Sequence, residues 1–488
     1  MSLAIRPEIT SSFRDDEEQA AAAAPLLAAV ASPARSRSHA GDVHILSAAF
    51  LFVFSAYLPT QNLQSTLNND GNLGAVSMGI VYVSFTVFAA MAAAVVRGLG
   101  SRGALLLGTS GYALFILANL HPTWYTMVPA SVYLGFTSSI MWVGQGTYLT
   151  SAALSHATEN KLNDGQVLGR FNGEFWGMFA STQVIGNLIS LVVLRNDKDG
   201  GGAEEKNLLF TVFLGCMVVG IVLMCLLSRR DENGLNRGGG GEGHDELPVP
   251  KHSFLWDMSK SAVAPLADRR MLLLAPLLAY YGLQKAFVWA VFTKSIVTPV
   301  LGVAGVGGAM ALYGTAGVVS SLVAGRLTTG LYSSTLIVSA GAVLQAGVLL
   351  WLLFFYRYIV LHQRVFFHEL IATLKLSAHQ EQYVSVCSPI GGVLGSAAPL
   401  LVGAVWGVGD GILNTQLSAL IGLLFKDKEA AFALGKMWQA AATAAVFFLS
   451  PGATLQGMLA AVGAALVVAL TAFLSLTLVV EGSCALKL

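Results

Sequence analysis

Charged residues are scarce in this sequence. Only 11% of its 488 residues are Asp, Glu, Lys or Arg, against roughly a quarter in a soluble globular protein. The net charge at pH 7 is +1 and no long basic tract is present, so the chain lacks the electrostatic footprint of a nucleic-acid-binding protein. This composition excludes an ordinary water-soluble enzyme and predicts no nucleic-acid partner.

Cysteines are also few, and recognisable catalytic motifs are lacking. Of the four cysteines, Cys216 and Cys225 fall in one apolar stretch, where a disulfide would tie a helix only to itself, so a disulfide framework is not expected. No P-loop for nucleotide phosphates occurs, and no nucleophile, base and metal ligands form a convergent set. The sequence therefore predicts no enzyme activity, no cofactor and no metal.

Apolar residues, in contrast, make up 55% of the chain. A helix needs about 20 of them to cross a hydrocarbon core of about 30 Å. Suitable stretches lie near residues 45–67, 74–97, 103–120, 124–153, 168–194 and 207–228, and then near 271–297, 304–327, 334–355, 393–424, 430–450 and 453–480. The sequence therefore predicts an all-α membrane protein with about 12 transmembrane helices in the lipid bilayer.

The segments outside the spans suggest how the chain is divided. Residues 229–270 contain a glycine run, prolines and several Lys and Arg, which is typical of a cytosolic linker. With both termini inside, most Lys and Arg of the loops and helix ends, Lys436 included, fall on the inner side, as the positive-inside rule requires. The expected order is a disordered cytosolic tail at 1–44, a six-helix half at 45–228, the linker, a six-helix half at 271–480 and a cytosolic tail at 481–488.

The two halves share residue patterns in the same order. The matched pairs are Ala56-Tyr57 with Gln61 and Ala279-Tyr280 with Gln284, Gly144-Gln145-Gly146 and Gly409-Asp410-Gly411, and Leu168-Gly169-Arg170 and Leu434-Gly435-Lys436. Two related six-helix halves joined by a cytosolic linker are the plan of the major facilitator fold, whose halves are parallel repeats. We therefore predict a major facilitator-like arrangement.

Residues 356–389 do not fit this repeat. The offset between matched positions is larger after this segment than before it, and by alternation its three basic residues would lie outside, against the charge rule. The segment is either an added extracytosolic insertion or a gene-model error such as an unremoved intron. Its three histidines follow no standard spacing of metal ligands.

Polar side chains within the spans are costly unless they face a partner or a wet cavity. At about 100° per residue, several of them share one helix face. The candidates for lining a cavity or binding an ion are Tyr57, Gln61, Gln64, Gln145, Asn172, Gln183, Asn187, Gln284, Lys285, Asp410 and Asn414. Hydrogen bonding and close packing between helices explain such residues equally well, so both interpretations stay open.

Three charged residues within the spans need separate treatment. Glu174 follows Arg170 by four residues, which predicts a local ion pair on one helix. Lys285 and Asp410 fall near the middle of the seventh and tenth spans, where an unpaired charge is costly, so we expect them to face one another. Such a pair is either a relay for a proton or cation, or a structural clamp.

Four stretches resemble the uncoordinated-93-like (unc-93) family, its plant branch most closely. They are Tyr57-Leu-Pro-Thr-Gln-Asn-Leu-Gln, Leu99-Gly-Ser-Arg-Gly-Ala-Leu-Leu-Leu-Gly-Thr-Ser-Gly-Tyr, Leu168-Gly-Arg-Phe-Asn-Gly-Glu-Phe-Trp-Gly and Gly409-Asp-Gly-Ile-Leu-Asn-Thr-Gln-Leu-Ser-Ala-Leu. The resemblance covers roughly residues 45–480 and leaves out the segment 356–389. It implies a divergent major facilitator fold, located in the plasma membrane or an endomembrane. It also implies a regulatory or accessory role in potassium homeostasis, with a potassium channel or another membrane protein as partner.

The loop after the second span departs from transporters of this fold. It begins at Arg97 and keeps basic and glycine residues, but it lacks the acidic residue typical of those transporters. The usual gating contact of this loop is therefore not expected. A secondary transporter coupled to protons or cations through Asp410 is the alternative function.

Overall fold

The computed structural model describes residues 39–68, 73–193, 203–229, 267–374, 393–450 and 452–485, and these contain helices and no strand. The first half holds α2 (His39–Leu67), α3 (Leu73–Ala118), α4 (Trp124–Asn160), α5 (Asp164–Val193) and α6 (Ala203–Leu226). The second holds α9 (Arg269–Ala286), the π-helix η3 (Phe287–Val297), α10 (Thr298–Leu327), α11 (Leu331–Leu374), α13 (Val393–Leu424), α14 (Lys428–Leu449) and α15 (Leu455–Ala485). Ten helices in this part of the chain are long and apolar enough to cross a membrane.

One of these ten, α3, contains two antiparallel segments. Tyr82 and Tyr112 both line one cavity, although 30 residues of straight helix would place them about 45 Å apart. The chain turns back at Gly100, whose φ of 71° and ψ of 159° are not helical. Only glycine adopts this left-handed φ without steric cost, so the second and third predicted spans are separate segments that meet at this residue.

Helix α5, with 30 residues, also has the length of a span, although it is not among these ten. Its polar side chains, Asn172, Gln183 and Asn187 among them, lower its hydropathy. It nevertheless lies inside the bundle, against α2, α10 and α13. With α5 and the two segments of α3 counted, the described residues agree with the expectation of about twelve spans.

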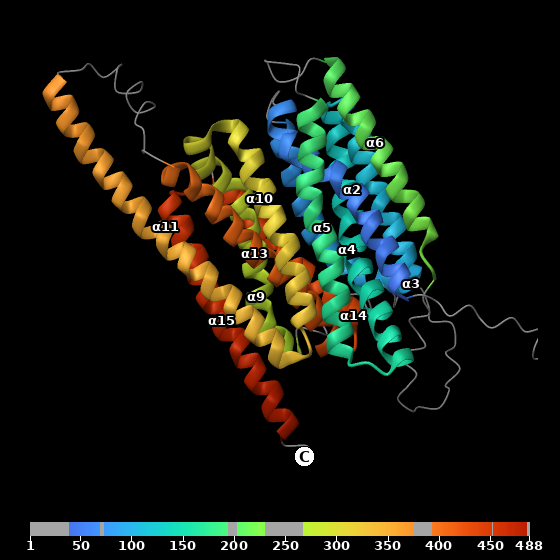
Figure 1. Cartoon of the computed structure of the whole chain (residues 1–488). Helices are drawn as coiled ribbons and strands as arrows, with labels where there is room; N and C mark the ends of the chain where they lie inside the picture. The colour runs from blue at the N-terminus through green and yellow to red at the C-terminus, as the bar shows by residue number, and fades with distance from the viewer. Residues whose placement is uncertain are drawn as a thin grey trace, which may run out of the picture.

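The helices form two bodies that pack against each other. Figure 1 shows α2 to α6 on one side and most of α9 to α15 on the other, with α5 beside α10 at the junction. Helix α14 also crosses to the first half, where it packs on α3 and α4. Each half has its own buried apolar core, with Phe50 and Phe175 in the first and Phe287 and Trp406 in the second.

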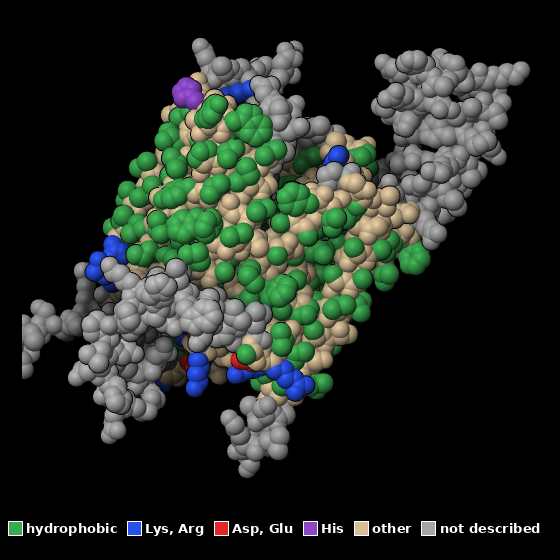
Figure 2. Space-filling view, turned by 180° about the vertical axis from the view of Figure 1, so that it is seen from behind, with side chains coloured by type: hydrophobic (Ala, Val, Ile, Leu, Met, Phe, Trp, Pro, Cys, Tyr) green, Lys and Arg blue, Asp and Glu red, His purple; other side chains and the backbone are tan. Residues whose placement is uncertain are grey.

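The outer surface of the bundle is apolar. Val87, Val192 and Leu478 expose 62%, 72% and 71% of their area, and Figure 2 shows hydrophobic side chains over most of one face, with Lys and Arg gathered mainly toward its lower end. Contiguous apolar surface of this extent is unstable in water. The chain is therefore a multi-pass membrane protein whose outer face contacts lipid.

The chain ends differ in detail from the sequence-based boundaries. Helix α2 begins at His39 and not after residue 44, because His39 Nε2 contacts Glu159 Oε1 at 2.8 Å and holds the first turn against the end of α4. Helix α11 continues to Leu374, so the first part of the 356–389 segment extends a helix that projects beyond its neighbours in Figure 1. The remaining parts of the expected tails, linker and insertion, at 1–38, 230–266, 375–389 and 486–488, lie outside the described residues.

Candidate functional site

A cavity of about 150 Å³ lies between the two halves. Helices α2, α3, α4 and α5 line it from the first half, and α9, η3, α10, α13 and α14 from the second. Eleven of its lining residues are aromatic, and three are charged, namely Lys285, Asp410 and Lys436. The cavity therefore combines an aromatic wall with a small group of charges at the junction of the halves.

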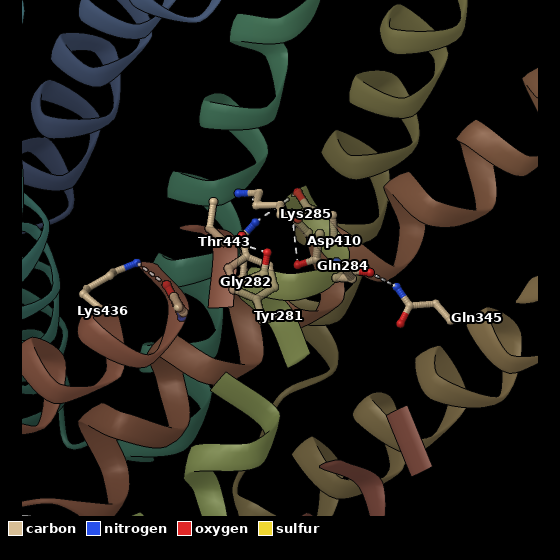
Figure 3. Close-up of polar contacts among 12 residues, drawn as sticks. Tyr281, Gly282, Gln284, Lys285, Gln345, Asp410, Lys436 and Thr443 are labelled. Carbon is tan, nitrogen blue, oxygen red and sulfur yellow. Dashed lines mark hydrogen bonds and ion pairs between the residues drawn. The ribbon is translucent and has the colours of Figure 1, made fainter. Parts of the chain in front are cut away.

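Lys285 and Asp410 face one another across this cavity, as predicted. Lys285 Nζ lies 3.7 Å from Asp410 Oδ1, and the two side chains are 16% and 11% exposed. Asn414 Nδ2 donates to Asp410 Oδ2 at 3.1 Å, and the Tyr281 hydroxyl donates to Asn414 Oδ1. Figure 3 shows this group from α9 and α13. The pair is thus embedded in a hydrogen-bond chain that fixes the carboxylate.

The hydrogen bonding of this group is incomplete. Within the described part of the chain, neither Asp410 Oδ1 nor the buried Tyr313 hydroxyl makes a hydrogen bond of ordinary length, although the hydroxyl interacts with the Asp410 carboxylate at longer range. Besides its pairing with Asp410, Lys285 Nζ lies 4.9 Å from the ring centroid of Tyr281 and 5.5 Å from that of Trp289. Unsatisfied buried polar atoms that face a cavity are able to accept a proton or hold a ligand.

Close packing of α13 on α10 places this carboxylate at the cavity. A Cβ at Gly407, one turn before Asp410, would lie 2.1 Å from the backbone oxygen of Tyr313. Only a glycine admits that approach. Asp410 and Tyr313 are therefore held in the same region by the backbones of their two helices.

Lys436 was expected at the inner surface, and the structure places it in the cavity instead. Its Nζ lies 4.8 Å from the ring centroid of Trp142 and 5.5 Å from that of Trp176, and it donates to Gln439 Oε1 at 3.3 Å. The two indoles stack, with centroids 5.7 Å apart and planes inclined by 4°. The inner-surface assignment was wrong because α14 begins at Lys428, two turns earlier, so that Lys436 is inside the bundle.

A helical pattern in the sequence could have identified this position. Lys436, Gln439, Ala440 and Thr443 follow the i, i+3, i+4, i+7 spacing of one helix face, and all four line the cavity. The positive-inside comparison counts basic residues on each side of the membrane and does not consider which helix face a residue occupies. Lys436 is thus the charged cavity residue that the sequence analysis missed.

The structure brings six of the eleven predicted site residues to the cavity and leaves five elsewhere. The six are Tyr57, Gln61, Gln183, Lys285, Asp410 and Asn414. The five that do not line it are Gln64, Gln145, Asn172, Asn187 and Gln284. Helical periodicity identified the polar faces, and the rotation of each helix in the bundle decided which of them reach the cavity.

Four of the five outlying residues bond within or between helices. Gln64 Nε2 donates to Oδ1 of Asn119, which follows α3, at 2.7 Å. Gln284 Oε1 accepts from Nε2 of Gln345 on α11 at 2.5 Å. Asn172 and Asn187 donate to backbone carbonyls one turn earlier. The fifth, Gln145, is buried with its Nε2 unpaired among the described residues. The packing interpretation therefore fits the first four.

The two halves also make a charged contact outside the cavity. Arg97, at the turn within α3, donates to Asp427 Oδ1 at 2.6 Å, and the same oxygen accepts from the Ala430 backbone N–H at the start of α14 at 3.1 Å. The absence of an acidic residue in the loop after the second span had suggested that no such contact forms. The loop supplies the cation here, and the other half supplies the carboxylate.

The predicted local pair on α5 is confirmed. Arg170 Nε donates to Glu174 Oε1 at 3.0 Å, and the two side chains are 57% and 25% exposed. Water therefore screens this pair, and it needs no functional role.

Comparison with known proteins decides the family. A family model described as "Ion channel regulatory protein UNC-93" matches residues 68–474. The chain belongs to the UNC-93 family. It is 51% identical to UNC93-like protein 3 of Arabidopsis thaliana over 89% of this chain and 86% of that protein. It is also 27% identical to the putative potassium channel regulatory protein unc-93 of Caenorhabditis elegans over 84% of this chain, which spans 56% of that longer protein.

Solved structures show the fold. The fucose:proton symporter of E. coli superposes with a TM-score of 0.59 at 11% identity, over 90% of this chain and 99% of that chain. A bacterial homologue of the iron transporter ferroportin in an outward-facing state gives a TM-score of 0.57 at 13% identity, over 89% and 99%. The UNC-93 chain therefore has the major facilitator architecture that its internal repeat predicted.

Proposed function

We propose that this UNC-93 chain is a regulatory or accessory membrane protein in potassium homeostasis, and that its partner is a potassium channel or another membrane protein. The observation that carries the proposal is the family match, whose description names ion channel regulation. A relative in Caenorhabditis elegans is named as a putative potassium channel regulatory protein. Because fold alone does not determine activity, the chemistry of the cavity must also be considered.

The chemistry of the cavity favours a regulator over a potassium pathway. Its lining carries the two ammonium groups of Lys285 and Lys436 and one carboxylate, that of Asp410. Potassium sites in channels are built from rings of oxygen ligands that replace the hydration shell, and two nearby ammonium groups repel a cation. Potassium is therefore expected to cross the membrane through the partner and not through this cavity.

The orientation in the membrane is part of the proposal. We assign the central linker and both termini to the cytosolic side, because the basic residues outside the spans gather there. The described chain runs from His39, beside the end of α4, to Ala485, at the lower end of α15 in Figure 1. The ion pair of Arg97 with Asp427 would then close the cytosolic side between the halves.

Flux and current measurements test the regulatory function together. The purified full-length chain in liposomes is expected to show no uptake of the potassium tracer rubidium above that of empty liposomes. Native cells from which the chain has been deleted are expected to show a changed potassium current, restored when the chain is returned. Unchanged potassium current after deletion would overturn the regulatory proposal.

A second candidate function is transport of a small solute coupled to protons or cations. The specific observation in its favour is the Lys285–Asp410 pair, 3.7 Å apart and open to the cavity. Buried carboxylates that face a water-filled cavity are typical of coupling sites in membrane transporters. Solute uptake by liposomes that contain only this chain, driven by a proton or cation gradient and lost on Asp410→Asn, would favour this function over the first.

A further inference from the structure

The two halves contribute different chemistry to the central cavity. The first half supplies aromatic and polar side chains and no charged one, and the stacked Trp142 and Trp176 form part of that wall. The second half supplies all three charged side chains, Lys285, Asp410 and Lys436. A ligand that spans the cavity would therefore meet rings on one side and charges on the other.

The charges of the cavity do not balance. Asp410 lies 3.7 Å from Lys285 and serves as its counter-charge. Lys436 makes no ion pair within the described residues, and its polar contact is a neutral amide oxygen of Gln439 at 3.3 Å. A buried ammonium without a carboxylate is stabilised by an anion that enters beside it.

The internal repeat shows where the carboxylate of this lysine is lacking. Lys436 occupies the position of Arg170 in the matched stretches, and Arg170 pairs with Glu174 one turn later. The position that corresponds to Glu174 in the second half is Ala440, which lines the cavity. The second half therefore has the cation without its partner, at a position that borders the cavity.

The size and lining of the cavity define the body of the anion. An apolar protein cavity of about 150 Å³ holds one benzene molecule, and this cavity has about that volume, with eleven aromatic residues in its lining. An aromatic ring fits the wall of the first half, and an acidic group fits the lysine.

We propose that the central cavity binds a small aromatic carboxylate, with its acid group at Lys436 and its ring against the wall that Trp142 and Trp176 form. The anion connects both halves, because the lysine comes from α14 and the indoles from α4 and α5. The ammonium already lies over both indoles, so the acid group approaches from its cavity side. The inference concerns the cavity that the transport alternative uses, but it requires neither flux nor a channel.

Equilibrium binding of radiolabelled benzoate to the purified full-length chain tests this proposal. Three probes share one ring and differ in charge: benzoate, benzyl alcohol and benzylammonium. We expect saturable binding of benzoate that unlabelled benzoate displaces, with at least tenfold weaker competition by the alcohol and the ammonium. Competition by benzylammonium equal to that of benzoate would overturn the proposal on the unaltered protein, without any variant.

Substitution of the lysine locates the anion. Lys436→Met removes a charge-assisted hydrogen bond, so benzoate affinity should fall roughly ten- to a hundredfold, whereas Lys436→Arg should retain most of it. Lys294→Met is the matched control, because Lys294 is exposed on η3 and does not line the cavity. Unchanged benzoate affinity in a folded Lys436→Met protein would refute the site. An absence of binding would leave the potassium proposal untouched, since that is measured as current in cells.

Discussion

Replacing Asp410 by asparagine leaves the ammonium of Lys285 without its nearest counter-charge. At the observed 3.7 Å and an effective dielectric constant of about 20, Coulomb's law gives an attraction of about 4.5 kcal/mol. Removing one partner of a buried pair costs about 3–5 kcal/mol. Because both side chains keep some contact with the cavity, we expect a loss near the lower limit, about 3 kcal/mol.

The cost should fall when the second charge is removed as well. Lys285→Met alone leaves a buried carboxylate, whereas Asp410→Asn with Lys285→Met leaves no charge at either of the two positions. Asparagine keeps an oxygen that accepts the hydrogen bond of Asn414, which Asp410 accepts at 3.1 Å, so the comparison isolates charge. We therefore expect the stability order wild type, then double variant, then each single variant.

Detergent-purified proteins would be compared by the midpoint of unfolding in mixed micelles and by the folded yield on size exclusion. Glu174→Gln is the matched control, because Glu174 and Arg170 form an ion pair that water screens. Its expected cost is at most about 0.5 kcal/mol. A double variant no more stable than either single variant would show that Lys285 and Asp410 are not energetically coupled.

Three further predictions concern packing and closure. Gly407→Ala should sharply reduce the folded yield on size exclusion, because a Cβ there would lie 2.1 Å from backbone, whereas Gly347→Ala, in open space, should not. Asp427→Asn should keep the N-cap hydrogen bond of α14 and lose the charge contact with Arg97, so cysteine labelling at the proposed cytosolic end should rise while the unfolding midpoint changes little. Asp427→Ala should also remove the N-cap bond and lower the free energy of unfolding by about 0.5–2 kcal/mol. Asn119→Leu should cost about 1–3 kcal/mol in the same unfolding assay, because the buried Gln64 Nε2 loses its acceptor and Asn68 Nδ2 loses one of its two.

The Lys285–Asp410 pair could be predicted because several independent constraints agree. Each residue falls in the middle of a long apolar stretch, where a charge needs a partner. The internal repeat assigns both stretches to the same half, and the major facilitator plan turns their helices toward one cavity. These constraints depend on composition and order along the chain, so no coordinates were needed.

The surroundings of Gln64 could not be predicted in the same way. Periodicity placed it on the polar face of the first span, together with Tyr57 and Gln61. In the structure Tyr57 and Gln61 line the cavity, but Gln64 bonds Asn119, which follows α3. The rotation of α2 about its own axis decides between these outcomes. That rotation is set by packing against neighbouring helices, which a single sequence does not specify.

Lys436 shows how a symmetric fold acquires an asymmetric site. The repeat gives the two halves related backbones, so Arg170 and Lys436 occupy corresponding helical positions. The first is exposed and paired with Glu174, whereas the second faces the cavity over two indoles of the other half. Because Ala440 stands at the position that matches Glu174, Lys436 has no carboxylate one turn later. If that is the origin of the anion site, Ala440→Glu should supply an internal carboxylate, abolish benzoate binding and leave the protein folded, and retained benzoate binding in that variant would contradict the assignment.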